Sequence, residues 1–228
     1  MNNMEKNTKE ALNAINLSQQ WEFPKYFEYD NINFVLYKDV FSPLFFKWFS
    51  TYIDYLPLKK WDNFLDMWCG CWIIWITSCL KYGLNKVICA DVNEIAVENT
   101  KENIAYNKLW DKISVIHSDV FSNIDKSNKF DLIFWNAPYF DWSFDEEKVL
   151  LKAMYDTNYE HIKKFIIEWQ NYLKNGGKLM IWFSSDKFPI EIARWYINDI
   201  WYDFYVYHQE QDILWYKQEI LEITKKNE

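Results

Sequence analysis

The segment Asn136-Ala-Pro-Tyr139 follows an apolar run at 130–135 and combines an amide, a proline and a phenol. A planar nitrogen, in an amide or an exocyclic amine, is a poor nucleophile because its lone pair is delocalised. The Asn136 side-chain oxygen and a loop carbonyl can accept the two hydrogens of such a nitrogen, and the Tyr139 ring can stack on the planar group. Positioning then supplies most of the catalysis, without a histidine base. We therefore predict that Asn136, Pro138 and Tyr139 are catalytic; the alternative is a strand that ends at a proline turn.

Three carboxylates, Asp66, Asp91 and Asp119, stand where three earlier strands are expected to end. In parallel sheets, ligands bind outside the carboxyl ends of the strands, and the N-terminus of a following helix attracts an anion. Asp91 lies about 20 residues past the turn that follows Asp66, which is the placement of an acid that binds ribose hydroxyls. That placement also suits NAD, so it does not choose the cofactor. The structural alternatives are a core strand at Asp66, a turn acid at Asp119, and, for Asp91, a residue that merely precedes Asn93, which is expected to cap the next helix.

The run at 64–76 places Trp68, Trp72 and Trp75 at positions where a tight turn and a helix start favour glycine. With glycine there, the run would read Asp-Met-Gly-Cys-Gly-Cys-Gly. It then resembles motif I (Asp-x-Gly-x-Gly-x-Gly) of the class I S-adenosylmethionine-dependent methyltransferases, although only Asp66 and Gly70 of the motif survive as written. The segment at 136–139 resembles the Asn/Asp-Pro-Pro-Tyr motif IV of members that modify planar nitrogens, with Ala137 as a departure.

The resemblance covers about residues 40–228 and implies S-adenosyl-L-methionine as the cofactor, with no metal. It places the methionine carboxylate at the turn and the methionine ammonium near Asp66. It places the ribose near Asp91 and the adenine near Asp119 and Val120. The cofactor-binding residues implied in this way are Asp66, Trp68, Gly70, Trp72, Asp91, Asn93, Asp119, Val120 and Asn136.

The composition favours the hypothesis that several tryptophans stand in for glycine. The chain has 4 glycines and 14 tryptophans, whereas an average protein of this length carries roughly 16 glycines at about 7% usage. Some genetic codes read UGA as glycine and others read it as tryptophan, so translation with the wrong code would write Trp for Gly. The same reasoning extends to Trp61, Trp110 and Trp201, whereas Trp48 and Trp135 are compatible with genuine tryptophan. The alternative is an aromatic-rich natural protein whose pocket is blocked.

Alternating strand and helix patterns from residue 62 onwards predict a parallel sheet built of βαβ units. Strands are expected near 62–67, 86–91, 112–117, 130–135 and 177–183, and helices near 73–82, 93–106, 158–174 and 188–200. Two terminal strands, near 202–208 and 213–223 and joined by 209–212, would form an antiparallel pair. The expected fold is therefore a Rossmann-like, doubly wound α/β fold with a mostly parallel seven-stranded sheet and a C-terminal antiparallel strand pair.

The expected organisation has three parts: a polar N-terminal extension at 1–20, a hairpin and helix on the substrate side at 21–57, and the methyltransferase domain at 58–228. Within the last part, 140–157 is a candidate lid. No apolar run reaches about 18 residues, so no membrane span is predicted. The four cysteines crowd into one segment and are expected to be small buried thiols in a reducing cytosol. We expect a cytoplasmic monomer.

The function predicted from these motifs is S-adenosylmethionine-dependent N-methylation of a planar nitrogen. The acceptor is a protein glutamine amide, in a release factor or a ribosomal protein, or the exocyclic amine of an RNA or DNA base. The net charge of −8 leans toward protein, because nucleic-acid binders usually carry a basic surplus. One rival is a nicotinamide-dependent oxidoreductase that uses the same turn. The other rival is a non-catalytic aromatic-rich binding protein in which the tryptophans are real.

Overall fold

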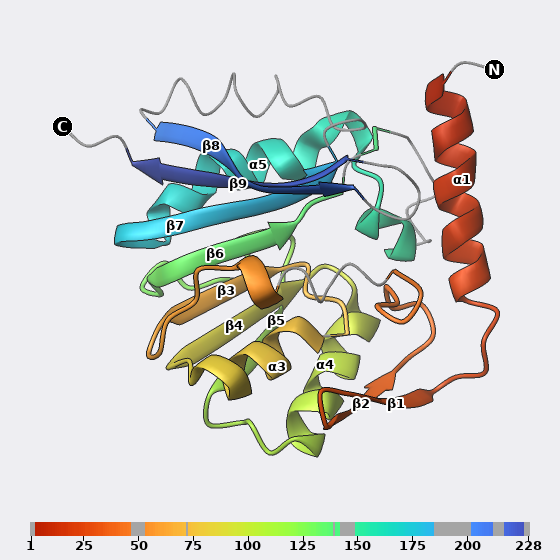
Figure 1. Ribbon diagram of the computed structural model, residues 1–228, viewed down its shortest axis with the longest axis horizontal. Coiled ribbons are helices and arrows are strands. Elements are labelled where there is room, and N and C mark those ends of the chain that lie inside the picture. The colour runs from red at the N-terminus through yellow and green to blue at the C-terminus, as the bar shows by residue number, and fades with distance from the viewer. Residues whose placement is uncertain are drawn as a thin grey trace.

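The computed structural model describes residues 3–46, 53–71, 73–138, 140–141, 149–184, 202–211 and 217–225. Its centre is a seven-stranded sheet in the order β5-β4-β3-β6-β7-β9-β8 (Figure 1). The strands are β3 (Asn63–Met67), β4 (Lys86–Asp91), β5 (Ile113–His117), β6 (Phe130–Asn136), β7 (Leu173–Ser184), β8 (Tyr202–Gln211) and β9 (Lys217–Lys225). Strands β3 to β7 are parallel, and β9 runs antiparallel to both β7 and β8. The predicted Rossmann-like α/β fold with a C-terminal antiparallel pair is confirmed.

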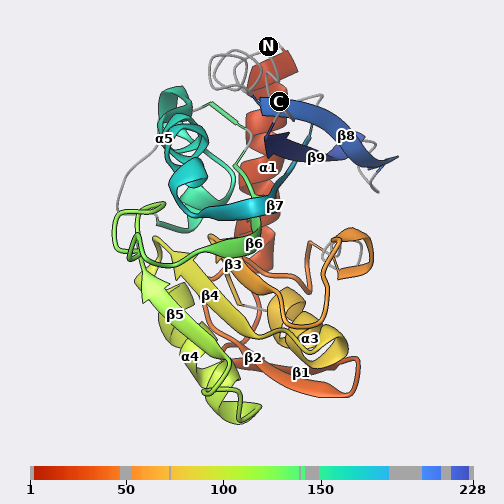
Figure 2. The ribbon, with the colours of Figure 1, turned by 90° about the vertical axis from the view of Figure 1, so that its left-hand side faces the viewer.

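Helices cover both faces of this sheet. They are α1 (Asn3–Ser18), α3 (Ile73–Tyr82), α4 (Glu94–Tyr106) and α5 (Glu160–Glu168), with the short 3-10 turns η1 (Val149–Ala153), η2 (Thr157–Tyr159) and η3 (Trp169–Asn171). Figure 2 shows α5 on the opposite side of the sheet from α3. Among the described residues, no helix is both long enough and apolar enough to cross a membrane.

The alternation of side chains along each strand builds two hydrophobic cores, one on each face of the sheet. Phe64 and Phe134 pack on the face that α3 and α4 cover, whereas their neighbours Leu65 and Ile133 pack on the face that α5 covers. All four side chains are buried. Because both faces are covered, the middle parts of β3, β4 and β6 read as mainly apolar runs, and a polar residue lies at or next to the carboxyl end of each.

A hairpin precedes the sheet and packs against α4. It consists of β1 (Lys25–Tyr29) and β2 (Ile32–Leu36), which pair antiparallel. The two connecting residues, Asp30 and Asn31, have φ values of 52° and 60°. A two-residue hairpin turn with positive φ at both positions favours Asp and Asn. The segment at 21–57 therefore contains the expected hairpin, and its place on the substrate side stays a prediction.

Buried asparagines on α4 hold the hairpin by hydrogen bonds to its backbone. Asn103 accepts a hydrogen bond from the Val35 N–H at 2.8 Å and donates to the Val35 carbonyl at 3.0 Å. The same side chain donates to the Cys71 carbonyl at 2.9 Å. One turn earlier, Asn99 accepts from the Tyr37 N–H at 3.1 Å and donates to the Val35 carbonyl at 2.8 Å. These amides take the place of a third strand along β2.

We expect Asn103→Ala to destabilise the chain by about 2–3 kcal/mol, because it leaves a buried N–H and a buried carbonyl without their partner. Urea unfolding of the variant measures the loss. Asn107→Ala is the matched control, since Asn107 lies one turn later and donates to the exposed Asn33 carbonyl; its cost should stay near 1 kcal/mol. If both variants lost the same free energy of unfolding, the buried amide of Asn103 would contribute no more to stability than the exposed one of Asn107.

The structure corrects the sequence-based boundaries in two places. The helix predicted over 158–174 ends at Glu168, because Trp169 and Tyr172 turn into the core and Leu173 already pairs with Phe130 as the start of β7. The connection predicted at 209–212 is also wrong, since β8 continues to Gln211. The polar extension predicted at 1–20 contains α1. The helix predicted near 188–200 lies outside the described residues, as do residues 47–52 of the segment at 21–57 that is expected to hold a hairpin and a helix.

Candidate active site

The turn after β3 adopts the left-handed backbone conformation twice, at Trp68 (φ 57°) and Gly70 (φ 61°). Two neighbours fix this turn. The Gly70 N–H donates to Asp91 Oδ2 at 2.8 Å, and the Thr100 hydroxyl donates to the Gly70 carbonyl at 3.0 Å. Trp72 lies outside the described residues, and α3 begins directly after it. A tight turn followed by a helix start is therefore present where the sequence predicts it.

Asp91 ends β4 and is 6% exposed. Its two oxygens accept backbone N–H groups, Oδ2 from Gly70 and Oδ1 from Asn93, each at 2.8 Å. Burial raises the pKa of this carboxyl from its usual 3.8 to about 6, and these backbone hydrogen bonds oppose the shift. Each carboxylate oxygen retains a second acceptor site. Asp91 can therefore hold the turn and still accept hydroxyl donors from a ligand.

Asn93 has a structural part in the same corner. Its side-chain oxygen accepts the Ile95 N–H at 3.0 Å and so caps α4, as the sequence predicts. Its side-chain nitrogen donates to the Asp39 carbonyl at 2.8 Å. These bonds fix the asparagine between α4 and the segment that follows the hairpin.

Asp66 lies near the carboxyl end of β3 and is 3% exposed. Burial raises the pKa of this carboxyl well above its usual value, and the neighbouring charge of Asp91 raises it further. A buried carboxyl group regains its ionised form when a cation approaches. Asp66 and Asp91 together therefore favour a ligand that brings a cationic group and hydroxyl groups to this end of the sheet.

Asn136 is the last residue of β6, and its side chain is half-buried. The next residue, Ala137, donates its N–H to the Trp182 carbonyl at 3.1 Å. A proline at that position, as in the Asn-Pro-Pro-Tyr pattern, has no N–H to donate, so the alanine adds a bond between β6 and β7. Pro138 is buried, and Tyr139 lies outside the described residues.

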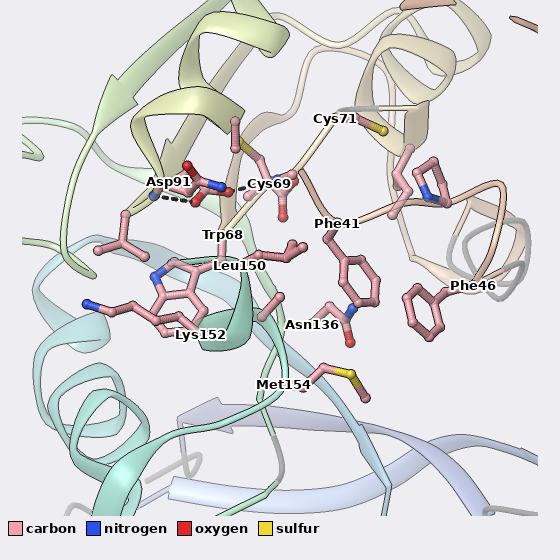
Figure 3. Close-up of a pocket in the computed structure, with 18 of the residues that line it drawn as sticks. Phe41, Phe46, Trp68, Cys69, Cys71, Asp91, Asn136, Leu150, Lys152 and Met154 are labelled. Carbon is pink, nitrogen blue, oxygen red and sulfur yellow. Dashed lines mark hydrogen bonds between the residues drawn. The ribbon is translucent and has the colours of Figure 1, made fainter. Parts of the chain in front are cut away.

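A pocket opens at the carboxyl ends of β3, β4 and β6 and brings most of these residues together (Figure 3). Its lining includes the predicted site residues Asp66, Trp68, Gly70, Asp91, Asn93 and Asn136. The walls are otherwise mainly apolar, which is typical of sites for small molecules and cofactors. The strand ends therefore gather the predicted acids and the predicted catalytic asparagine around one space.

Asp119 and Val120, the residues predicted to contact adenine, are not among the described residues that line this pocket. Val120 is fully buried with φ 49°, an uncommon conformation for a β-branched residue. Lys164 Nζ lies 3.0 Å from Asp119 Oδ2, and His161 Nε2 lies 3.6 Å from Asp119 Oδ1. Asp119 Oδ1 is buried and has no hydrogen-bond partner among the described residues.

The family model of the methyltransferase small domain matches residues 47–191, more than half of the chain. The chain belongs to the methyltransferase small domain family. The match includes β3 to β7, α3 to α5 and every strand end that lines the pocket. The predicted membership of the class I methyltransferases is therefore confirmed.

Several curated methyltransferases are similar to this small domain over part of their length. A protein of Methanocaldococcus jannaschii, assigned by name to the protein N5-glutamine methyltransferases, is 38% identical over 112 residues, 47% of this chain and 55% of the relative. The release factor glutamine methyltransferase of Clostridium botulinum is 36% identical over 93 residues, 40% of this chain and 32% of the relative. Ribosomal RNA small subunit methyltransferase C of Haemophilus influenzae is 29% identical over 135 residues, 59% of this chain and 36% of the relative. The chain thus spans about half or less of these relatives.

Solved structures share the fold at lower identity. The structure of the Mtq2–Trm112 complex of E. cuniculi, whose title names methylation of the eRF1 translation termination factor, matches with a TM-score of 0.58. Sequence identity in that comparison is 18%, over 82% of this chain and 99% of the other. At this identity the likeness concerns the architecture of the methyltransferase small domain.

Sequence reasoning missed the other walls of the pocket. Phe41, Pro43 and Phe46 come from the segment after the hairpin, and the rings of Phe41 and Phe46 stack at 4.4 Å. Leu150, Lys152 and Met154 come from η1 and its end, within the predicted lid segment. No local spacing marks these residues, because tertiary contacts alone bring them to the strand ends.

The cysteines of this methyltransferase small domain are free thiols, and three of them, Cys71, Cys79 and Cys89, are buried. Burial raises the pKa of Cys71 to about 12, so this thiol stays protonated. Within the described part of the chain, no three His, Cys, Asp or Glu side chains gather as a metal site would require.

Proposed function

We propose that this chain is an S-adenosylmethionine-dependent N-methyltransferase that acts on a planar nitrogen, with a protein glutamine amide as the acceptor. The observation that carries the proposal is the position of Asn136, which lines the same pocket as the buried Asp66 and Asp91. An amide-recognising side chain and a pair of cofactor-type carboxyls thus share one space. The alternative function, a nicotinamide-dependent oxidoreductase, gives no reason for an asparagine at the end of β6.

Most residues of the pocket fit the proposed cofactor. The buried Asp91 carboxyl suits the ribose hydroxyls, and the buried Asp66 suits the ammonium group. The turn at Gly70 has the left-handed backbone that allows a ligand to approach closely. Trp68 is the exception, because its indole occupies part of the space that these residues surround.

The chain's own contribution to the reaction is to bind and position. The cofactor, when bound, supplies an electrophilic methyl group. The side-chain oxygen of Asn136 would accept a hydrogen bond from the acceptor nitrogen and so fix the plane of that group. The rate enhancement would then come from orientation. The apolar walls formed by Phe41, Phe46 and Met154 would exclude water from the reacting groups.

A protein amide is the acceptor that the chemistry and the relatives favour. The net charge of −8 opposes the electrostatic attraction that dominates binding to nucleic acids. Two of the relatives are named for glutamine methylation, and the ribosomal RNA relative points to the alternative acceptor. We propose that the chain acts in the cytoplasm as a monomer. In this proposal Pro138 and Tyr139 complete the loop that holds the acceptor, and Asp119 and Val120 contact the adenine.

Methyl transfer from radiolabelled S-adenosylmethionine into a cell extract, fractionated into protein and RNA, tests this proposal. The chain is used in the form with glycine at residues 68 and 72, alongside the chain as printed. We expect label in a protein band, in alkali-stable form on glutamine. Label in RNA alone would overturn the protein acceptor, and binding of NAD but not S-adenosylhomocysteine would overturn the function.

A further inference from the structure

Trp68 combines three unfavourable features at one position of the site. Its φ of 57° lies in the left-handed region, which a bulky residue enters only at a cost. Its indole Nε1 is buried and has no hydrogen-bond partner among the described residues, and such an unsatisfied donor is itself costly. Its ring also lines the pocket that the buried carboxyls surround. Gly70, two residues later, has nearly the same φ without any of these costs.

The indole of Trp68 lines the pocket and also contacts His161, a residue that approaches Asp119. Its ring stands edge-on to Trp135, with the centroids 5.2 Å apart, and edge-on to His161 at 5.1 Å. His161 in turn reaches to 3.6 Å from Asp119. In Figure 3 the indole is drawn on the same side of the pocket as Asp91, away from Phe41.

A ring in this position would account for a pocket that ends before Asp119. The lining includes Asp66, Asp91 and Asn136, and among the described residues it does not include Asp119 or Val120. A side chain that lies between these two groups separates them. Removing the indole would extend the pocket toward Asp119, whose Oδ1 has no hydrogen-bond partner among the described residues and lies 3.6 Å from His161 Nε2.

A second tryptophan shows the same backbone conformation outside the site. Trp61, in the turn before β3, has φ 73° and is 66% exposed. Trp110 does not follow the pattern: at that corner Lys108 has the positive φ, so glycine was predicted at the wrong residue. Val120 and Lys108 also have positive φ, so φ alone does not identify a misplaced residue. At Trp68 it coincides with a buried unsatisfied donor and a divided pocket.

We propose that residue 68 is glycine in the working protein, encoded by UGA, and that glycine at 68 opens the pocket through to Asp119. The composition agrees, since 14 tryptophans accompany only 4 glycines. The claim about the pocket rests on the proposed function, whereas the claim about the residue does not. Trp72 occupies the next glycine position of motif I and belongs to the same inference by its place in the sequence.

Calorimetric titration with S-adenosylhomocysteine compares four chains: the chain as printed, the double variant Trp68→Gly with Trp72→Gly, Trp68→Ala, and Trp61→Gly. We expect the double variant to bind at least about 100-fold more tightly than the printed chain, since an aromatic side chain no longer fills the site. Trp68→Ala removes the indole but keeps the unfavourable φ, so its affinity should lie between the two. Trp61→Gly is the matched control, because it relieves the same backbone conformation away from the pocket and should leave binding unchanged.

The codon at residue 68 supplies a reading that does not depend on ligand binding. We expect UGA; a UGG codon there overturns the proposal, as does equal binding by the printed chain and the double variant. If UGA is found but neither chain binds S-adenosylhomocysteine, the proposed function fails while the assignment of glycine stands. Circular dichroism of each variant confirms that it is folded before the affinities are compared.

Discussion

Asn136→Ala, made in the chain with glycine at 68 and 72, should lower kcat for methyl transfer by at least about 100-fold. A displacement of a reacting group by about 1 Å is enough to slow a reaction to that extent. The asparagine ends β6 and lines the pocket, so under the proposed function its loss would leave the acceptor nitrogen without its orienting oxygen. The dissociation constant of S-adenosylhomocysteine should change by less than about tenfold. Single-turnover transfer and calorimetric titration measure the two effects separately.

Asn136→Asp is the informative companion variant. The aspartate keeps an oxygen at the same place, and the family pattern admits either residue, so part of the activity should return. A variant that loses binding and turnover to the same extent would show that Asn136 acts on the cofactor alone. Retained activity in Asn136→Ala would remove the main argument for a planar nitrogen acceptor.

Asp91→Asn should weaken binding of S-adenosylhomocysteine by about 10- to 100-fold, since an amide accepts only at one of the two positions that now hold Gly70 and Asn93. The pH dependence follows from the raised pKa of about 6 in the ligand-free chain. If Asp91 holds the ribose as proposed, the hydroxyls would donate to the ionised carboxylate, so affinity should rise as the pH is raised from 5 to 7 and level off above it. Titration calorimetry across this range, with Asp91→Asn as the flat reference, is the measurement.

The raised pKa of Asp91 also affects the stability of the ligand-free chain, which should fall as the pH rises, whereas the affinity should increase. The folded carboxyl binds its proton up to about pH 6, whereas the unfolded carboxyl releases it near 3.8. The contribution of Asp91 to stability is therefore fully present below about pH 4 and is lost as the pH rises through 6. Asp66 acts in the same direction. A pH profile of S-adenosylhomocysteine affinity that runs parallel to the stability profile would contradict this assignment.

The sequence predicted the parts of the fold that depend on local pattern. Apolar runs ending in Asp66, Asp91 and Asn136 fix β3, β4 and β6, because parallel strands buried on both faces need such runs. The predicted helix at 73–82 coincides with α3, and the predicted cap at Asn93 is observed. The carboxyl ends of parallel strands meet at one edge, so the predicted strand ends were enough to expect Asp66, Asp91 and Asn136 near one another.

The rest depended on contacts that are distant in sequence. Phe41 and Met154 reach the pocket through loops whose course follows from packing on the sheet. The hydrogen bonds from the asparagines on α4 to the hairpin were not predicted, since no spacing rule tells which amide will meet a hairpin. The helix predicted to 174 ends early because Tyr172 packs against Phe121, with ring centroids 4.5 Å apart, and tertiary packing overrides helical periodicity.

The side-chain amide of Asn103 grips the Val35 backbone and the Cys71 carbonyl at once. A ligand that restrains the turn at Cys71 should therefore also restrain the hairpin. A partner bound to the hairpin should likewise restrain the turn, because linkage between two sites is reciprocal. The exchange of the Val35 amide proton with solvent would then slow when a ligand fills the pocket. The affinity of a macromolecule that binds the hairpin would depend on whether the methyl donor is bound.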